Sequence, residues 1–578
     1  MEGDGKKSRT ATTMVSGAEA LVQMLRLYGV RHIFGLCGDT SLPFYDALAR
    51  LDHGMQHVLT RDERSAAYMA DAYSRVCGRV GVCEGPSGGG ATYILPGVVE
   101  ANESSSALLA ITTDISVSSR GRFTLTELDQ QNLFRPLTKW NTVIDRADKL
   151  PEAVRAAFRA MTTGRPGAVH LGLPLDVQRE NLSRSEIWAQ SELQMVPAWR
   201  TGPDPSTVTA AAELLILAQR PLIICGGGVI IAGAEAELAA LAELVGAAVA
   251  TTVSGKGTIA DSHPLALGVV GSNGGTPMTR EVVDSADLIF FVGCRAGSVT
   301  TEKWRHPKRG TRVVHLDVDP AVIGVNYPTE VAMVGDAKLA LLALLGAVGA
   351  GVTGSSGDSR VQAEFVALIA DAKRRKFEEF GRYAREADSP IRPERLVASL
   401  NEVLPDDAII VADPGTPCPY FSAYYQLNRP GRHFISNRAH GALGYSMAAA
   451  LGAWYARPDR KCVAIMGDGS FGFTSGELET IVRCRAPLLM VVVSNASYGW
   501  IKAGQKTGFD GRYFSVDFSR TDHARVAAAY GVKSWRVEDP QQLRDVLAQA
   551  AECGGPALVD VIAQPLHEAH APVSEWVV

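Results

Sequence analysis

Paired cysteines, long apolar runs and an excess of positive charge are all missing from this sequence. Its nine cysteines are scattered singly without a CxxC motif, which argues against a disulfide framework and against a zinc site. No run of about 18 apolar residues is present to span a bilayer. The opening stretch MEGDGKKSRTATT lacks the apolar core of a signal peptide, and the formal net charge is −5. We therefore expect a cytoplasmic protein without a nucleic-acid or membrane partner.

The 578 residues are too many for one hydrophobic core. Short apolar strands alternate with Ala- and Leu-rich helical stretches in three segments. This texture predicts an α/β fold of three domains, each a mostly parallel sheet with helices on both faces. The expected domains are residues 14–185, 203–345 and 390–565, followed by a tail at 566–578. The Gly- and Ser-rich stretch 346–360 is predicted to be a flexible linker.

One Gly-Asp-Gly turn, residues 467–469, follows the apolar strand KCVAIM and precedes a predicted helix. The next predicted strand, LLMVVVSN, ends at Asn495. Because parallel strands deliver their carboxyl ends to one edge of a sheet, we expect Asp468 and Asn495 to lie close together. A carboxylate and an amide oxygen suit Mg²⁺ or Ca²⁺, and the amides of Gly467 and Gly469 can donate to a phosphate. The turn predicts a seat for a metal-bridged diphosphate.

The stretch GDGSF…SN, with this spacing, resembles the diphosphate and metal motif of thiamine diphosphate enzymes. The resemblance extends from Val15 to about Leu566. It implies thiamine diphosphate and Mg²⁺ as cofactors, with the backbone carbonyl of Ser497 as the third metal ligand. Ser494 departs from the usual Asn at its position. In TRDERSAAYMADAYSRVCGRVGVCEGPSGGGATY, Glu63 stands where the family has the glutamate that protonates the aminopyrimidine ring.

Further cofactor contacts follow from the same resemblance. In SNRAHGALGY, Leu443 is expected under the bent cofactor, with the Gly441 carbonyl and the Leu443 amide at the pyrimidine edge. The family builds its site between two chains, which implies a homo-oligomer, with a dimer of dimers expected. The full expected cofactor set is Gly415, Thr416, Gly441, Leu443, Gly467, Asp468, Gly469, Ser470, Asn495 and Gly499.

Two branches of the family fit the remaining motifs. RPLTKW, TTGRPGAVHLGLPLDVQ and SGKGTIADSHPLALG resemble acetolactate synthases. Two positions depart from that branch: Thr126 stands at a catalytic Gln, and Gly504 stands at the Trp that selects the second 2-ketoacid. DPGTPCPYFSAYYQLNRPGRHFISNRAHGALGY instead resembles bacterial 2-hydroxyacyl-CoA lyases, relatives of oxalyl-CoA decarboxylase. The leading expectation is a lyase that releases formyl-CoA and a carbonyl compound; a synthase-like or 2-ketoacid-decarboxylating enzyme is the alternative.

An acyl-CoA substrate needs cations for its phosphates. The densest basic cluster of the middle domain is the expected contact, with a solvated loop as the equally weighted alternative. Binding of the adenosine part of FAD or ADP by the same segment is a further alternative. The cluster consists of Arg295, Lys303, Arg305, His306, Lys308 and Arg309.

Proton transfer in such a lyase has several candidates besides the cofactor itself, namely Asp114, Glu127 and Lys502, and Thr126 is a further expected catalytic-site position. Lys502 acts as a base only if burial keeps it neutral. The apolar tail QPLHEAHAPVSEWVV either closes over the pocket or packs on the surface. A catalytically dead regulatory paralogue is the remaining class. Retention of Glu63, Asp468 and Asn495 together argues against it.

Overall fold

The computed structural model describes residues 14–351 and 359–576. The expected α/β class is confirmed, because three six-stranded sheets form and every strand pair within them is parallel. Contacts within the chain divide it into two units. The first runs up to Ala70 and continues over Val80–Ala198, and the second contains Asp71–Arg79 and everything from Trp199 onward.

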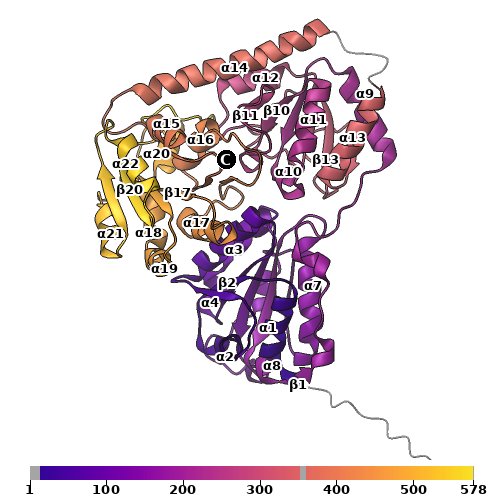
Figure 1. The fold of residues 1–578 in the computed structure, drawn as a ribbon, viewed down its shortest axis with the longest axis vertical. Coiled ribbons are helices and arrows are strands. Elements are labelled where there is room, and N and C mark those ends of the chain that lie inside the picture. Colours follow the sequence, from indigo (N-terminus) through magenta and orange to yellow (C-terminus); the bar gives the residue numbers. More distant parts are fainter. Residues whose placement is uncertain (1–13, 352–358, 577–578) are drawn as a thin grey trace, which may run out of the picture. The chain divides into compact units, whose positions relative to one another are not determined.

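The first unit contains one of these sheets, with strand order β3-β2-β4-β5-β7-β6. Its central strands are the apolar runs expected from the sequence, and all seven residues of both β5 and β7 are buried. Helices α5 and α7 pack on these two strands, and α7 is labelled beside this sheet in Figure 1. The strands are β2 (His32–Gly35), β3 (Gln56–Leu59), β4 (Gly81–Gly85), β5 (Leu108–Asp114), β6 (Trp140–Val143) and β7 (Ala168–Pro174).

Eight helices accompany this sheet among the described residues, and α1 begins with a capping box in which Ser16 and Glu19 bond each other's backbone amides. A short antiparallel pair, β1 (Met14–Ser16) and β8 (Asn181–Ser183), joins the two ends of the unit. The helices are α1 (Gly17–Leu27), α2 (Leu42–Arg50), α3 (Glu63–Cys77), α4 (Gly89–Tyr93), α5 (Leu95–Glu103), α6 (Gln130–Phe134), α7 (Leu150–Thr162) and α8 (Leu175–Arg179).

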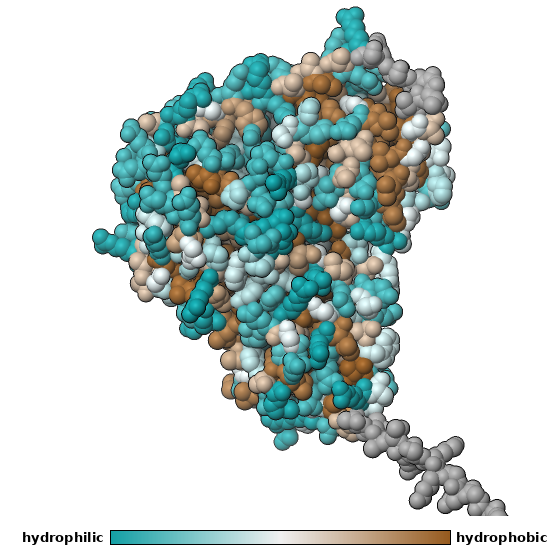
Figure 2. Space-filling model, viewed as in Figure 1, coloured by the Kyte–Doolittle hydropathy of each residue, from teal (hydrophilic) through white to brown (hydrophobic). Residues whose placement is uncertain are grey.

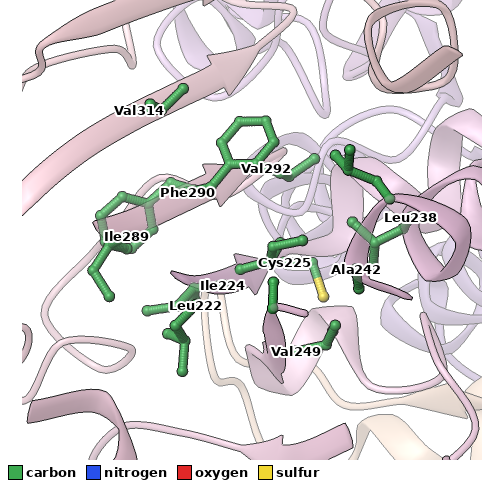
Figure 3. Close-up of a cluster of buried hydrophobic side chains, with 14 of the residues drawn as sticks. Leu222, Ile224, Cys225, Leu238, Ala242, Val249, Ile289, Phe290, Val292 and Val314 are labelled. Atoms are coloured by element: carbon green, nitrogen blue, oxygen red, sulfur yellow. The ribbon is translucent and has the colours of Figure 1, made fainter. Parts of the chain in front are cut away.

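The central sheet of the second unit has the order β11-β10-β9-β12-β13-β14. Its core is mostly aliphatic with a few aromatic side chains: Figure 3 shows Leu238 and Ala242 of one helix beside Cys225 and Val249 of the strands. Full burial of a side chain such as Phe290 stabilises the fold by about 1.5–3 kcal/mol. The strands are β9 (Pro221–Cys225), β10 (Ala248–Thr251), β11 (Ala266–Val269), β12 (Leu288–Val292), β13 (Arg312–Asp317) and β14 (Val331–Val334). The helices are α9 (Pro205–Leu217), α10 (Gly227–Ala232), α11 (Glu235–Val245), α12 (Pro277–Ser285) and α13 (Ala337–Gly351).

The third sheet has the order β16-β15-β17-β18-β20-β19. Its middle strands β17 and β18 are neighbours, as expected for the strands that lead to Asp468 and Asn495. The strands are β15 (Ile409–Ala412), β16 (Phe434–Ile435), β17 (Cys462–Gly467), β18 (Leu489–Ser494), β19 (Lys533–Val537) and β20 (Ala557–Ile562). The helices are α15 (Pro393–Val403), α16 (Pro417–Tyr424), α17 (Tyr445–Ala456), α18 (Asp468–Thr474), α19 (Glu477–Arg483), α20 (Gly499–Gly508), α21 (His523–Ala529) and α22 (Leu543–Ala551).

The predicted flexible linker 346–360 is wrong over its first residues. Helix α13 continues through Gly346 and Gly349 to Gly351, because buried Leu341, Leu344 and Val348 anchor it on the central core. The rest of the linker prediction falls largely on residues 352–358, which lie outside the described residues. The long helix α14 (Ser359–Arg385) then packs on both α12 and α15 (Figure 1).

The surface is mostly hydrophilic, with hydrophobic residues gathered where α9, α11 and α13 lie (Figure 2). Exposed Leu217, Leu244 and Leu342 contribute to this region. All nine cysteines lie within the described residues and are free thiols. Among the described residues, no helix is both long and apolar enough to cross a membrane.

Candidate functional site

Asp468 and Asn495 meet at the carboxyl edge of the third sheet, as the strand pattern predicts. The Asp468 carboxylate accepts hydrogen bonds from the amides of Asn495 and Ala496 at 2.8 and 2.6 Å, and from Gly469 at 2.9 Å. Burial raises the pKa of the Asp468 carboxyl, while these amides act in the opposite direction. The Asn495 side-chain oxygen accepts from the amide and hydroxyl of Ser497. The loop is therefore folded around two oxygen donors.

These donors fit a hard cation. Asp468 and Asn495 each contribute a side-chain oxygen, and the Ser497 carbonyl accepts the Gly499 amide at 2.9 Å, which leaves a second lone pair on that oxygen. No cluster of three or more His, Cys, Asp or Glu side chains capable of holding a metal occurs in the described part of the chain. The expected set contains one such residue, so this finding leaves it a prediction.

Three of the glycines expected at the site border open space, whereas Gly469 is packed against Tyr498, 2.8 Å from where its Cβ atom would lie. A Cβ atom built on Gly415, Gly441 or Gly467 meets no other atom within 4 Å. Gly415 and Gly441 have φ values of 91° and 76°, a backbone conformation that side chains other than glycine rarely adopt. Ser470 is buried and accepts the Gly444 amide at 3.3 Å, which ties the turn after β17 to the half-buried Leu443 segment. The residues present therefore fit a diphosphate cofactor.

Sequence reasoning missed a buried cluster that supports the metal loop. The Ser494 hydroxyl lies 2.5 Å from the Asp560 carboxylate and 3.0 Å from Nδ1 of His523. Asp560 also accepts the His523 amide at 3.1 Å. Ser494 thus fixes the end of β18 directly before Asn495, which accounts for a polar side chain at this departure from the family pattern. Residues so distant in the chain carry no local signal of their proximity.

Glu63 opens helix α3 in the first unit and is only 7% exposed. Its carboxyl packs on the glycine-rich turn after β4: a Cβ atom at Gly90 would lie 3.1 Å from Oε1, and one at Gly85 would lie 3.3 Å from Cγ. Burial raises the pKa of Glu63, and the nearby charges of Asp62 and Glu84 raise it further. A carboxyl with a raised pKa is suited to holding and giving up a proton.

A second buried carboxyl in this unit was not anticipated. Glu84, on β4, is fully buried, and burial raises its pKa. The Tyr45 hydroxyl donates to its Oε1, and Nε2 of His57 lies 3.0 Å from that hydroxyl. Gly35 makes room for it, because a Cβ atom there would lie 2.4 Å from Oε1. The sequence signal was a charged residue inside an otherwise apolar strand.

Thr126 lies in a strained loop. Its φ is 67°, which is unusual for a β-branched residue. Its hydroxyl lies 2.7 Å from that of Ser87, which in turn is bonded to Thr40 at 3.1 Å. Glu127 is exposed and accepts the amides of Gly121 and Thr124, so it braces its own loop.

Two other proton-transfer candidates are held in ion pairs. The Lys502 ammonium lies 2.7 Å from the Asp517 carboxylate, so this lysine is engaged in an ion pair within the chain. Asp114 is buried at the end of β5 and lies 3.1 Å from Arg120. Burial raises the pKa of Asp114 in spite of that arginine.

The basic cluster of the central domain is largely neutralised within the chain. Lys303 and Arg305 both pair with Glu575 of the tail. His306 and Lys308 both face Asp284, at 2.6 and 3.8 Å. Arg295 and Arg309 belong to the same segment, and Arg309 is exposed. Four of the six side chains expected to bind CoA phosphates are therefore paired with carboxylates of the same chain.

Together these features define an α/β protein with a diphosphate and metal cradle in one sheet and a buried glutamate in another. Models of the thiamine pyrophosphate (thiamine diphosphate) enzymes match the chain in three places. The N-terminal TPP binding domain matches residues 15–133, the central domain 208–344 and the C-terminal TPP binding domain 413–561. The chain belongs to the thiamine diphosphate-dependent enzyme family.

Relatives are similar over nearly the whole length. A probable acetolactate synthase large subunit of Methanococcus aeolicus is 34% identical over 563 residues, covering 95% of this chain and 92% of the relative. The corresponding protein of Methanocaldococcus jannaschii is 35% identical over 567 residues, with the same coverage. The acetolactate synthase isozyme 3 large subunit of Escherichia coli is 29% identical over 540 residues, covering 93% and 92%.

These relatives overturn the leading expectation from the sequence. The expected 2-hydroxyacyl-CoA lyase, with formyl-CoA as product, is wrong, because the near full-length relatives bear acetolactate synthase names. The pairing of Lys303, Arg305, His306 and Lys308 with acidic side chains removes the physical argument for CoA as well. The synthase-like alternative agrees better with these findings.

Proposed function

We propose that this protein is a thiamine diphosphate- and Mg²⁺-dependent enzyme that decarboxylates a 2-ketoacid and joins the product to a second carbonyl compound, as an acetolactate synthase does. The observation that carries the proposal is the similarity to proteins named acetolactate synthase, at 34% and 35% identity over nearly the whole chain. The cradle around Asp468 and the buried Glu63 support it, since both belong to cofactor chemistry of this kind.

In this proposal the third sheet binds the cofactor. Asp468, Asn495 and the Ser497 carbonyl hold Mg²⁺, and the amides of the turn after β17 donate to the diphosphate. The open space at Gly415 and Gly441 admits the phosphate and pyrimidine ends. When bound, thiamine diphosphate supplies a carbon nucleophile for a carbonyl substrate. The Asp468 carboxylate by itself would repel a diphosphate, and a bound Mg²⁺ would offset that repulsion.

The role of the first sheet is to hold a proton. Glu63 is proposed to share its carboxyl proton with a ring nitrogen of the cofactor, and burial raises the pKa of that carboxyl, which favours the protonated form. The packing of Gly85 and Gly90 fixes where the carboxyl oxygen lies. Thr126, held by Ser87, is proposed to face the substrate at the position where acetolactate synthases carry Gln.

A homo-oligomer and a cytoplasmic location are part of the proposal. Phe123 and Leu125, which precede Thr126, are 100% and 83% exposed in the single chain, as expected for side chains that another subunit covers. The nine free thiols fit a reducing compartment. Light scattering on the purified protein tests the assembly, and a monomer at micromolar concentration would contradict it.

The activity is tested by giving the purified protein pyruvate with thiamine diphosphate and Mg²⁺, beside the variant Glu63→Gln. Carbon dioxide and acetolactate from the wild type, lost in the variant, are the expected result. Cofactor binding without turnover of pyruvate or any larger 2-ketoacid would overturn the proposal and favour a catalytically dead paralogue.

A further inference from the structure

The last described residues of the chain are bound to the central domain. The amide of Gly274 donates to the Pro572 carbonyl at 2.9 Å, and the Ser574 amide donates to Ser272 at 3.2 Å. Asn273 and Val573 face each other as an antiparallel bridge. The tail therefore follows a defined path, because directional backbone bonds fix it at two points.

Side chains add a second attachment. Glu575 pairs with both Arg305 and Lys303, and the Ser574 hydroxyl donates to Glu302 at 2.8 Å. Arg280 holds Glu302 in turn, at 2.8 Å. The charge of Glu575 is therefore matched by two cations, and the tail segment 572–576 is pinned at its carboxyl side.

The segment of the central domain that contacts the tail has an unusual backbone conformation. Glu302, Lys303 and Trp304 are three successive residues in the left-handed region, with φ of 50°, 57° and 60°. Such a run is rare for residues other than glycine and persists only where surrounding contacts determine it. Here the turn aims Glu302 and Lys303 at the same stretch of tail. The strain and the tail contacts coincide in one place.

Beyond Glu575, the tail reaches helix α20. The indole N–H of Trp500 donates to the Trp576 carbonyl at 3.1 Å, and the two rings lie 5.1 Å apart. Gly504 lies one turn further along the same face of α20. A Cβ atom at Gly504 would lie 4.0 Å from the Cβ of Trp576. Because Gly504 has no side chain, the tail can approach the helix closely.

Helix α20 also borders the cofactor cradle. At its first residue, Gly499, a Cβ atom would lie 3.3 Å from the Thr416 hydroxyl and 3.6 Å from the Asn495 side chain. Arg438 precedes Gly441 by three residues, and its guanidinium lies 5.6 Å from the ring centre of Trp500. Trp500, which contacts Trp576, therefore follows directly in the chain after a residue that packs against Thr416 and Asn495.

We propose that Trp576 is a specificity-determining residue: pinned by Glu575, it forms a wall of the substrate pocket beside Gly504 and limits the size of the 2-ketoacid side chain. This inference rests on the proposed function. It assigns the cations Lys303 and Arg305 to the chain's own carboxyl end. A bulky 2-ketoacid is excluded by the indole, and a small one is accepted.

The pinning is tested first, on the protein without cofactor or substrate. Glu575→Gln removes the charge and keeps the shape, and Glu568→Gln is the matched control, a tail carboxylate that pairs only with His567 among the described residues. Hydrogen exchange followed by mass spectrometry should show faster exchange at the Gly274 and Ser574 amides in Glu575→Gln alone. The exchanged pair Arg305→Glu with Glu575→Arg should restore protection. Equal exchange in wild type and Glu575→Gln would overturn the pinning.

Selectivity is tested with Trp576→Ala, and Trp199→Ala, an exposed tryptophan outside the tail, is the control. The ratio of kcat/KM for 2-ketoisocaproate to that for pyruvate should rise about tenfold or more in Trp576→Ala, as expected for a pocket enlarged by a large apolar side chain. If Trp576→Ala is active and this kcat/KM ratio is unchanged, Trp576 does not limit substrate size. The proposed function would then still hold. A wild type that converts no 2-ketoacid would overturn both the function and the wall, and the exchange result would still decide whether the tail is pinned.

Discussion

The first and third sheets have the same topology and different chemistry. Numbered in chain order within each sheet, the strands run 2-1-3-4-6-5 in both, whereas the central sheet runs 3-2-1-4-5-6. In each of the two like sheets the order reverses between the first and third strands, which is where parallel sheets bind ligands. The third sheet places Asp468 at the end of its third strand and Asn495 at the end of its fourth, and the first sheet places the glycine-rich turn, which follows its own third strand, against Glu63. A shared framework thus carries a binding site in one copy and a proton-holding group in the other.

The largest effect is expected from Asp468→Asn in the third sheet. Loss of the carboxylate removes the charged metal ligand, and thiamine diphosphate affinity in the presence of Mg²⁺ should fall more than about 100-fold. Isothermal titration calorimetry measures this, with Asp510→Asn as an exposed control whose carboxylate pairs with Arg512. If Asp468→Asn bound thiamine diphosphate with wild-type affinity, the third sheet would not have the cofactor-binding role proposed for it.

The first sheet should respond in the opposite way. Glu63→Gln should lower turnover by about 10²–10⁴-fold, because a proton-transfer group is lost, while cofactor affinity stays within about tenfold of wild type. Steady-state rates and calorimetry on the same preparation separate the two quantities. A variant that loses the cofactor along with its activity would show that Glu63 contributes chiefly to binding.

A smaller effect is expected at the turn that positions Glu63. A Cβ atom at Gly90 would lie 2.4 Å from Pro86 and 3.1 Å from the Glu63 carboxyl, whereas at Gly89 the nearest atom is 3.9 Å away. Gly90→Ala should therefore destabilise the fold by about 1–3 kcal/mol and lower turnover about tenfold. Gly89→Ala should leave both almost unchanged. Urea denaturation and rate measurements compare them, and equal behaviour would contradict the packing argument.

The last effect leaves activity unchanged, concerns stability alone and compares two buried carboxyls. Glu394 of α15 has no hydrogen-bond partner for either oxygen among the described residues, and burial raises its pKa to about 7. A raised folded pKa means that its favourable contribution is present below the ordinary pKa of 4.5 and is lost as pH rises through about 7. Glu394→Gln should therefore stabilise the fold by up to about 3 kcal/mol at pH 8 and hardly at pH 4.

Thermal unfolding at the two pH values measures this difference. Glu84→Gln is the counterpart in the first sheet, where Tyr45 already donates to the carboxyl. It should show a smaller gain at pH 8, because the amide must replace an existing hydrogen-bond acceptor. A pH-independent effect of Glu394→Gln would contradict the buried, proton-holding state of that carboxyl.

The inner strands could be predicted from sequence because both of their faces are buried, and near-continuous apolar runs such as VVHLDV and LLMVVVS follow from that. The apolar pattern did not predict the edge strands β3, β16 and β19. Strands β3 (QHVL) and β19 (KSWRV) contain exposed polar residues, and β16 has only two residues. The proximity of Asp468 and Asn495 followed from parallel strand order. The contact of Ser494 with His523 and Asp560, and that of Glu575 with Arg305, depend on tertiary packing that no local pattern encodes.

The pinned tail has a practical consequence for producing this protein. Trp576 lies against Trp500 of α20, so an affinity tag joined to the chain close behind Trp576 would add bulk and charge beside that contact. A tag joined on the amino-terminal side, before Met14, is not attached to this segment. Preparations tagged at the two positions are expected to differ in substrate preference.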